Sequence, residues 1–210
     1  MTTDPVRSSS ARITRYTHSC VRIERDGAVL VVDPGIWSEP SALDGADAVL
    51  VTHEHSDHVD VLRLVGLGVP VYAPAGARIS GLDVIRVKPG TPFTPGGFAV
   101  TAVGARHAQV FEDEPDCANL GYIIDDRIYH PGDALFVPDQ PIETLLVPLQ
   151  ASWLKTAEAI SFLRAVGPKR AFGIHDAQIN SRGLHGANNW LTDQGRNGYR
   201  YLAPGEGFDL

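Results

Sequence analysis

One segment, residues 53–58 (His-Glu-His-Ser-Asp-His), constrains this chain more than any other part of it. Only Thr52 separates it from the apolar run Ala48 to Val51. That run has the composition of a buried strand. In extended chain, His53 and His55 point to the same side because side chains alternate with a period of two. Any fold of this chain must therefore accommodate a cluster of imidazole and carboxylate groups beside its core.

Imidazole nitrogens and carboxylate oxygens are good ligands for zinc, and they also suit iron, manganese and cobalt. Four donors, His53, His55, Asp57 and His58, can serve two metal ions from one short loop. Each has a more ordinary interpretation, since Asp57 would make a good helix N-cap and His58 a core histidine. Those interpretations would have to hold for all four residues at once, directly after a buried strand. We therefore favour metal binding.

The composition is that of a folded, acidic protein. Its 210 residues suit one domain, and 43% hydrophobic with 20% charged residues excludes disorder of the chain as a whole. The formal net charge of -7 leaves no global basic field that would attract nucleic acid or an anionic membrane surface. The eight histidines are more than chance would supply, and their placement matters more than their number.

Several features bear on where the protein resides. Residues 2–5 carry no apolar run, so a secretory signal is not predicted. The apolar stretch 64–77 is interrupted by prolines and is shorter than the roughly 20 residues that a membrane helix needs. Cys20 and Cys117 do not make a disulfide framework, so we expect two reduced thiols. These features predict a cytoplasmic protein without a membrane partner.

Short apolar and alternating runs predict many strands between helices, which indicates a mixed α/β or α+β layered domain. The strands are predicted over Arg12 to Tyr16, Cys20 to Arg25, Ala28 to Val32, Ala48 to Val51, Val69 to Ala73, Val84 to Val87, Phe98 to Val103, Gly121 to Ile124, Arg127 to Tyr129, Thr144 to Val147 and Ala171 to Ile174. Helices are predicted over Asp57 to Gly66, Thr156 to Val166 and Gly186 to Asp193. In the first helix His58, Leu62 and Val65 would share one face, and Gly167-Pro168 would end the second.

Taken together, these motifs resemble the metallo-β-lactamase fold superfamily of metal-dependent hydrolases. The segment 53–58 matches its HxHxDH signature, and further motifs stand in the family's order at Val31-Val32-Asp33-Pro34-Gly35, Ala105-Arg106-His107, Tyr129-His130-Pro131-Gly132-Asp133 and Phe172-Gly173-Ile174-His175. Thr17-His18-Ser19-Cys20 resembles the start of the subgroup that includes ascorbate-6-phosphate lactonase-like and phosphodiesterase-like enzymes. The resemblance covers residues 12 to 202. It implies a four-layer αββα sandwich in a single domain, residues 12–210, after a flexible tail, residues 1–11.

The resemblance also implies a set of metal ligands. The first metal would be held by His53, His55 and His107, the second by Asp57, His58 and His175, and Asp133 would bridge the two. The three ligands outside the motif have ordinary alternatives as well. His107 could be a loop histidine, Asp133 a turn aspartate after Gly132, and His175 a core histidine.

Other residues are expected to support or line this site. Asp33 is expected to accept a hydrogen bond from the free ring N–H of a ligand, although it also suits a turn before Pro34. His18 is a candidate catalytic residue that lines the pocket, with a buried structural role as its alternative. Trp37 and Trp153 are the candidates for pocket walls. His130 is expected beside the ligands or on the surface, and His185 in a glycine-rich loop.

The implied function is a binuclear metal-dependent hydrolase of a small ester, lactone or phosphodiester. Two divalent ions, most simply zinc with manganese and iron as alternatives, would lower the pKa of a bridging water so that hydroxide is the nucleophile, oriented by Asp57. The site would keep a small positive charge, which favours an anionic substrate or transition state. Either His18 or a second water would protonate the leaving group.

Three rival functions follow from the same motif. An iron-dependent oxidoreductase acting on oxygen or persulfides would use the same ligands, and metal identity separates it from a hydrolase. A nuclease is disfavoured because the chain is acidic and lacks an inserted basic domain. Metals that only stabilise the fold are disfavoured because closed structural zinc sites are often cysteine-rich. We expect a small-molecule substrate and no nucleic acid. The acidic segment Gln109 to Asp116 would disfavour a polyanion at the rim of the pocket, but a solvated acidic loop is the preferred interpretation. The oligomeric state is left open.

Overall fold

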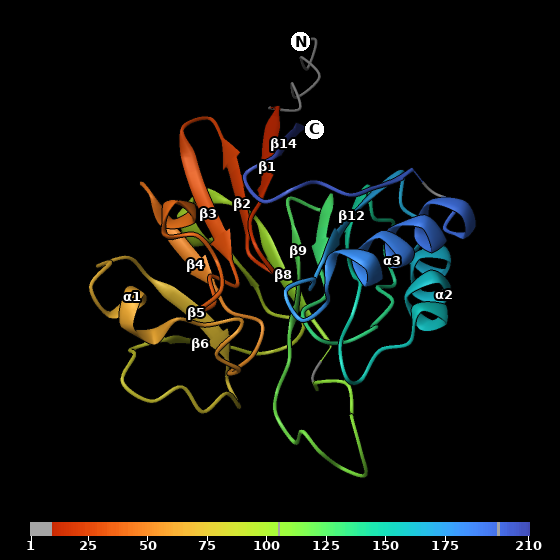
Figure 1. The fold of residues 1–210 in the computed structure, drawn as a ribbon. Helices are drawn as coiled ribbons and strands as arrows, with labels where there is room; N and C mark the ends of the chain where they lie inside the picture. The colour runs from red at the N-terminus through yellow and green to blue at the C-terminus, as the bar shows by residue number, and fades with distance from the viewer. Residues whose placement is uncertain (1–9, 105, 197) are drawn as a thin grey trace.

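The computed structural model describes residues 10–104, 106–196 and 198–210, which form two seven-stranded sheets packed face to face with helices outside them (Figure 1). Sheet 1 runs from edge to edge through β14 (Gly207–Asp209), β1 (Ala11–Arg15), β2 (Val21–Arg25), β3 (Ala28–Val32), β4 (Ala48–Leu50), β5 (Val71–Pro74) and β6 (Ile85–Val87). Sheet 2 runs through β13 (Tyr199–Arg200), β12 (Arg170–Ile174), β11 (Thr144–Pro148), β10 (Ile128–His130), β9 (Gly121–Ile124), β8 (Val100–Val103) and β7 (Pro92–Phe93). The helical elements are η1 (Pro40–Leu43), α1 (Val61–Val65), η2 (Pro95–Gly97), α2 (Thr156–Val166) and α3 (Ser181–Gln194).

The central core lies between the two sheets, and strand alternation decides which side chains enter it. In β3, Leu30 and Val32 face this core, whereas Val29 and Val31 face the outer side of sheet 1. There they pack with Leu43 of η1 and with residues of α1. On the other side of the molecule, α2 and α3 cover the outer face of sheet 2. The expected four-layer αββα arrangement is therefore confirmed.

The residues of interest follow strands that point in the same direction. β3 and β4 pair in parallel in sheet 1, as do β10, β11 and β12 in sheet 2. Asp33 follows β3, the segment 53–58 follows β4, Asp133 follows β10 and His175 follows β12 directly. Loops at one end of rigid strands are where functional groups usually gather. The topology thus brings segments that are far apart in the sequence to one edge of the sandwich.

Most predicted elements are confirmed to within about two residues, and α2 has the predicted bounds. Its end at Gly167 is also as expected, because that residue takes the left-handed conformation. The strands β7, β13 and β14 were not predicted. Each is only two or three residues long and lies at the edge of its sheet, where pairing with the neighbouring strand defines it.

The helix predicted over Asp57 to Gly66 is wrong at its start. α1 begins at Val61, and its N-cap is Asp60, whose side chain accepts a hydrogen bond from Arg63 N at 3.2 Å. Leu62 is 90% exposed, so it shares no buried face with His58. Instead the chain turns sharply before the helix, where the backbone N–H of His58 donates to His55 O at 2.9 Å. Tertiary contacts of the motif override the helical pattern here.

The third helix is longer than predicted. It begins at Ser181 after the N-cap Asn180, whose side chain accepts from Gly183 N at 3.0 Å. His185 therefore lies on an exposed part of α3 and not in a glycine-rich loop. The tail predicted over residues 1–11 falls mostly outside the described residues, and its last residue, Ala11, opens β1. Ala105 of the predicted Ala105-Arg106-His107 motif also lies outside the described residues.

Within the part of the chain that the structure describes, no helix combines the length and the apolar character that a membrane crossing requires.

Candidate metal centre

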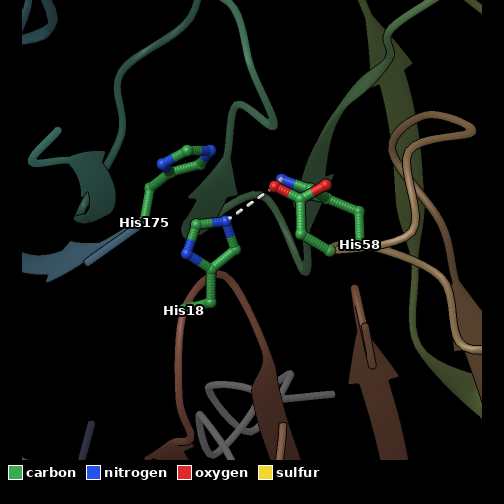
Figure 2. A group of neighbouring side chains, drawn as sticks. His18, His58 and His175 are labelled. Atoms are coloured by element: carbon green, nitrogen blue, oxygen red, sulfur yellow. Dashed lines mark hydrogen bonds and ion pairs between the residues drawn. The ribbon is translucent and has the colours of Figure 1, made fainter. Parts of the chain in front are cut away.

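All seven predicted metal ligands lie together at one edge of the sandwich. Ligand atoms of His53, His55 and His107 lie within 4.8 Å of one another, and those of Asp57, His58 and His175 lie within the same distance of one another and of His18. We call these sets the first and the second ligand group. A third set, His53, His58 and Asp133, joins them. Figure 2 shows the rings of His58 and His175 from the second group, with the ring of His18 beside them.

Asp133 occupies the position between the two groups. Its Oδ2 lies 3.3 Å from His107 Nε2 of the first group and 3.0 Å from His175 Nε2 of the second. Its Oδ1 lies 3.2 Å from His58 Nε2. The Trp153 indole also donates a hydrogen bond to Asp133 Oδ2 at 3.1 Å. One carboxylate thus contacts ligands of both groups, which is the arrangement that a bridging ligand requires.

The motif loop is held in place by the turn that follows β3. Asp33 accepts from both the backbone N–H and the hydroxyl of Thr52, each at 2.7 Å. Asp33 itself has a φ of 50°, so it forms the expected turn as well as the expected contacts. Gly35 lets this turn approach the motif closely, because a Cβ at that position would lie 1.8 Å from the carbonyl oxygen of Asp57. The two loops therefore fold as one unit.

The ring nitrogens of three ligands follow a common rule. His58 Nδ1 contacts Asp33 Oδ2 at 2.7 Å, His107 Nδ1 contacts Ala108 O at 2.6 Å, and His175 Nδ1 contacts Gln150 O at 2.5 Å. Carboxylate and carbonyl oxygens only accept hydrogen bonds, so each Nδ1 carries a proton and the neutral ring keeps its lone pair on Nε2. The contact of Asp33 with a ligand ring is the one expected from the sequence.

Three of the atoms that face the centre lack hydrogen-bond partners. His58 Nε2, His107 Nε2 and Asp133 Oδ1 are buried and make no hydrogen bond, although buried polar atoms in proteins almost always do. In metal sites, a ligating histidine typically donates its other N–H to an oxygen and points the free nitrogen at the ion. The residues present therefore fit divalent metal ions held by imidazole nitrogen and carboxylate oxygen.

His53 and His55 complete the first group. They face each other with different ring nitrogens, Nε2 of His53 and Nδ1 of His55. His53 Nε2 and His55 Nδ1 are 3.1 Å apart, and the Thr52 hydroxyl lies 3.1 Å from His53 Nδ1. His55 Nε2, which points away, contacts Cys117 Sγ at 3.8 Å. Cys117 was not predicted to approach the site, and no local pattern indicated it, since 62 residues separate it from His55.

The charges of the site are set by burial and by neighbouring ligands. Burial lowers the pKa of His53 well below its ordinary value. Burial would also lower the pKa of His58, but the carboxylates of Asp133 and Asp33 outweigh it and raise that pKa well above its ordinary value. Burial would raise the pKa of Asp133, yet His58 and His175 hold it well below the usual range. An ion bound at His58 must displace a proton, so metal loading should fall as the pH falls.

The remaining predicted residues also lie close to the centre. His18 is buried, and its Nε2 lies 3.1 Å from Asp57 Oδ2, the contact drawn as a dashed line in Figure 2. Trp37 packs edge-on against the His18 ring with 4.9 Å between ring centroids. His130 is fully buried and bridges two loops, accepting from Gly132 N at 3.2 Å and donating to Ser19 O at 2.8 Å. It supports the loop of Asp133 and does not face the ligand groups.

A cavity of about 150 Å³ opens beside the ligands. His55, Asp57, His107, Asp133 and His175 line part of it. The rest of its lining comes from Val110, Pro115, Trp153 and Gln178, together with Ala151 and Ser152. A space of this size accommodates a small organic group next to the ligand atoms. Trp153, predicted as a pocket wall, has that position.

Comparison with known proteins gives a consistent result. A family model described as a beta-lactamase superfamily domain matches residues 12–175. Protein Rv0786c of Mycobacterium tuberculosis is 37% identical over 188 residues, which are 83% of this chain and 89% of that protein. A UPF0173 metal-dependent hydrolase of Chelativorans sp. is 30% identical over 146 residues, which are 58% of this chain and 62% of that relative.

Among solved structures, Igni18 has a similar fold. It is a metallo hydrolase from the hyperthermophilic archaeon Ignicoccus hospitalis, and it aligns with a TM-score of 0.74 over 96% of this chain and 99% of its own. At 20% sequence identity, this likeness establishes the fold alone.

Proposed function

This chain belongs to the β-lactamase superfamily and is a metal-dependent hydrolase of the metallo-β-lactamase fold; we propose that it uses two divalent ions to hydrolyse a small ester, lactone or phosphodiester. The observation that carries the proposal is the arrangement of ring nitrogens around Asp133. His107 of the first group and His58 and His175 of the second direct Nε2 toward it, with each Nδ1 donating outward to an oxygen. That is the pattern of ligands prepared for metal.

Two ions fit this chain better than one. The two groups have separate sets of donors, and Asp133 contacts both. A single ion would leave one group of buried imidazoles without a function. We assign His53, His55 and His107 to the first ion, Asp57, His58 and His175 to the second, and Asp133 to both.

When bound, such ions lower the pKa of water enough to supply hydroxide at neutral pH and polarise a substrate oxygen. The chain's own residues do the rest. Asp133 is held in place by Trp153, and by Asn119, whose Oδ1 accepts from Asp133 N at 3.0 Å. Asp57 remains ionised, because the hydrogen bond from His18 overcomes the effect of burial and lowers the pKa of Asp57 to about 2. Its carboxylate can therefore accept a hydrogen bond from the attacking water and orient it.

The small volume of the cavity favours a small substrate. Its volume of about 150 Å³ is below the range of roughly 300–1,000 Å³ that is usual for pockets holding drug-sized ligands. Val110, Pro115 and Trp153 offer apolar contact beside the ligands. The acidic side chains of Glu112, Asp113, Glu114 and Asp116 follow on the same loop, and with the net charge of -7 they disfavour a nucleic acid substrate.

Metal content of the untagged protein, purified without chelators and measured by elemental mass spectrometry, tests the proposal. We expect about two zinc or manganese ions per chain, and hydrolysis of members of a panel of lactones, phosphodiesters and thioesters. His55→Ala should lose metal and activity together. Full metal loading with retained activity in that variant would refute the ligand assignment. Iron as the dominant metal would favour oxygen or persulfide chemistry, and a protein that takes up no metal on reconstitution would refute the hydrolase proposal.

A further inference from the structure

His18 stands at the second ligand group like a fourth ligand. It occupies the turn between β1 and β2 and is only 1% exposed. Its ring centroid lies 3.9 Å from that of His175 and 5.5 Å from that of His58. Because its Nε2 lies 3.1 Å from Asp57 Oδ2, distance alone would assign it to the second ion. The contacts of its other nitrogen point to a different role.

The backbone N–H of Ala177 donates a hydrogen bond to His18 Nδ1 at 3.2 Å. A backbone amide can only donate, so Nδ1 must offer a lone pair and cannot carry a proton. The neutral imidazole then carries its proton on Nε2, the nitrogen that faces Asp57. This is the reverse of His58 and His175, whose Nδ1 atoms face oxygen acceptors outside the centre and whose Nε2 atoms face Asp133. A nitrogen that carries a proton cannot bind a metal ion.

A flipped ring of His18 does not offer an alternative to this placement of the proton. Rotation of the ring by 180° would place carbon atoms opposite both Ala177 N and Asp57 Oδ2, and both hydrogen bonds would be lost. The backbone of His18 is fixed as well. Its N–H donates to Asp176 Oδ1 at 3.1 Å, and its carbonyl accepts from His175 N at 2.9 Å.

A buried ion pair holds the segment 175–177, which makes these hydrogen bonds to His18. Asp176 pairs with Arg15, which is fully buried, and also accepts from the Tyr201 hydroxyl at 2.9 Å. Both His18 and His175 have positive φ angles, 67° and 59°, which non-glycine residues rarely adopt. Such strained conformations persist where surrounding contacts determine them, and they concentrate at functional sites. The hydrogen bonds between His18 and residues 175–177 therefore fix the direction of the His18 ring relative to the second group.

We propose that His18 is a positioning residue and not a metal ligand: its Nε2–H donates to Asp57 Oδ2 and orients that carboxylate toward the second ion. This inference rests on the proposed two-ion function. Asp57 Oδ2 lies 4.0 Å from His58 Nε2, and a carboxylate oxygen has a second lone pair that can bind an ion while the first accepts from His18. The second ion then has Asp57, His58, His175 and Asp133 as protein ligands. His18 takes up no coordination position that water or substrate needs.

Two measurements test this role. The first is the two-bond ¹H–¹⁵N correlation pattern of the zinc-loaded protein labelled with ¹⁵N-histidine, which reports the protonated nitrogen of each ring. We expect His18 as the Nε2–H tautomer, and His58, His107 and His175 as the Nδ1–H tautomer. A His18 Nε2 that carries no proton would overturn the proposal.

The second measurement is zinc stoichiometry and affinity of variants, by chelator competition. His18→Ala should bind as many ions as the wild type but hold one of them about 10- to 100-fold more weakly, the usual cost of losing a group that orients a ligand. His18→Gln, whose amide can still donate to Asp57, should recover part of that affinity. His175→Ala, the matched ligand variant, should lose one ion.

The outcomes separate this proposal from the proposed function. Loss of one ion in His18→Ala, to the same extent as in His175→Ala, would make His18 a ligand and overturn the proposal. A wild-type protein that binds no zinc would refute the two-ion function. Because the Ala177 contact does not depend on metal, the Nε2–H tautomer of His18 is still expected in that case. A melting temperature measured for each variant confirms that it is folded.

Discussion

The two ligand groups differ in the residues that contact the outer nitrogens of their histidine rings. In the second group, His58 contacts the buried carboxylate of Asp33, and the adjoining loop is anchored by the buried pair of Arg15 and Asp176. In the first group, His55 is only partly buried, and its outer nitrogen meets the thiol of Cys117 at 3.8 Å. A charged acceptor forms a stronger hydrogen bond than a thiol, and it raises the basicity of the ligand ring. The ligands of the second group are therefore held more firmly than those of the first, so the ion of the second group should be the more tightly bound.

Removing the carboxylate that both groups share should have the largest effect. We expect Asp133→Asn to lose more than about 100-fold in activity and to bind at least one ion less firmly, because the amide cannot bridge two cations. Metal content and hydrolysis measured on the same preparation check this. Unchanged two-metal stoichiometry in Asp133→Asn would count against a bridge and would leave the two groups independent.

Deleting one ligand from each group should remove a different ion in each case. His55→Ala should lose the ion of the first group and keep the other, whereas His175→Ala should lose the ion of the second. In the wild type, we expect a chelator to remove the two ions in two phases, and His55→Ala should show only the slower one. Chelator kinetics with a metal-sensitive dye provide the measurement. A single phase in the wild type, or loss of the slow phase in His55→Ala, would reverse the ranking.

Replacing the residues that hydrogen-bond to the outer ring nitrogens should weaken the two ions to different extents while leaving every ligand in place. Asp33→Asn should weaken the second ion by about 10- to 100-fold, because the ring of His58 loses its charged acceptor. Cys117→Ala should weaken the first ion by less than about 10-fold, because a thiol is a weak acceptor. Zinc affinities from competition titration give both values, and Cys117→Ser, which restores an acceptor, is the matched control. Equal losses in Asp33→Asn and Cys117→Ala would show that the two groups are equally prepared.

The smallest effect should come from Glu39, which anchors the turn of His18 on the side of the second group. Its carboxylate accepts from Thr17 N at 2.9 Å and Thr17 Oγ1 at 2.6 Å. Burial would raise the pKa of Glu39, but these hydrogen bonds outweigh it and lower the pKa below its ordinary value of 4.5. A lowered pKa in the folded state means that this stabilisation is complete above the unfolded value and is lost as the pH falls through the folded value.

We therefore expect Glu39→Gln to lower the free energy of unfolding by about 1 kcal/mol at neutral pH, and by less as the pH falls below about 4. Thermal melts of the metal-free wild type and Glu39→Gln across this pH range provide the test, since acid would otherwise remove the metal. A difference that grows as the pH falls would contradict the assigned sign. No difference at any pH would mean that Thr17 does not anchor the turn.

Local patterns predicted most of the fold, because periodicity and end signals are properties of short stretches of chain. The apolar run Ala48 to Val51 was predicted as a buried strand and forms the buried β4, and the glycine after Val166 marked the end of α2. The same reasoning failed at residues 57–66, where the spacing of His58, Leu62 and Val65 suggested a helix. There the contacts of the motif with Asp33 and its turn decided the backbone, and no local pattern records contacts with another strand.

The donors of the candidate site were also predictable, whereas their supporting partners were not. The motif at residues 53–58 put four donors in one loop, and its resemblance to a known family supplied His107, Asp133 and His175. Neither indicated that Cys117 meets His55 or that Asn119 holds the loop of Asp133. These partners lie in segments that are distant in sequence, and their residue types carry no signal of their own.

The chemical kind of the site follows from the order of the residues alone, because that order puts imidazole and carboxylate donors at the ends of strands. The role of each ring nitrogen depends instead on contacts between distant parts of the chain. Ala177, which sets the tautomer of His18, is 159 residues away along the chain. A ring has the same composition whichever nitrogen carries the proton, so the choice belongs to the donor or acceptor that the sheet topology places beside it.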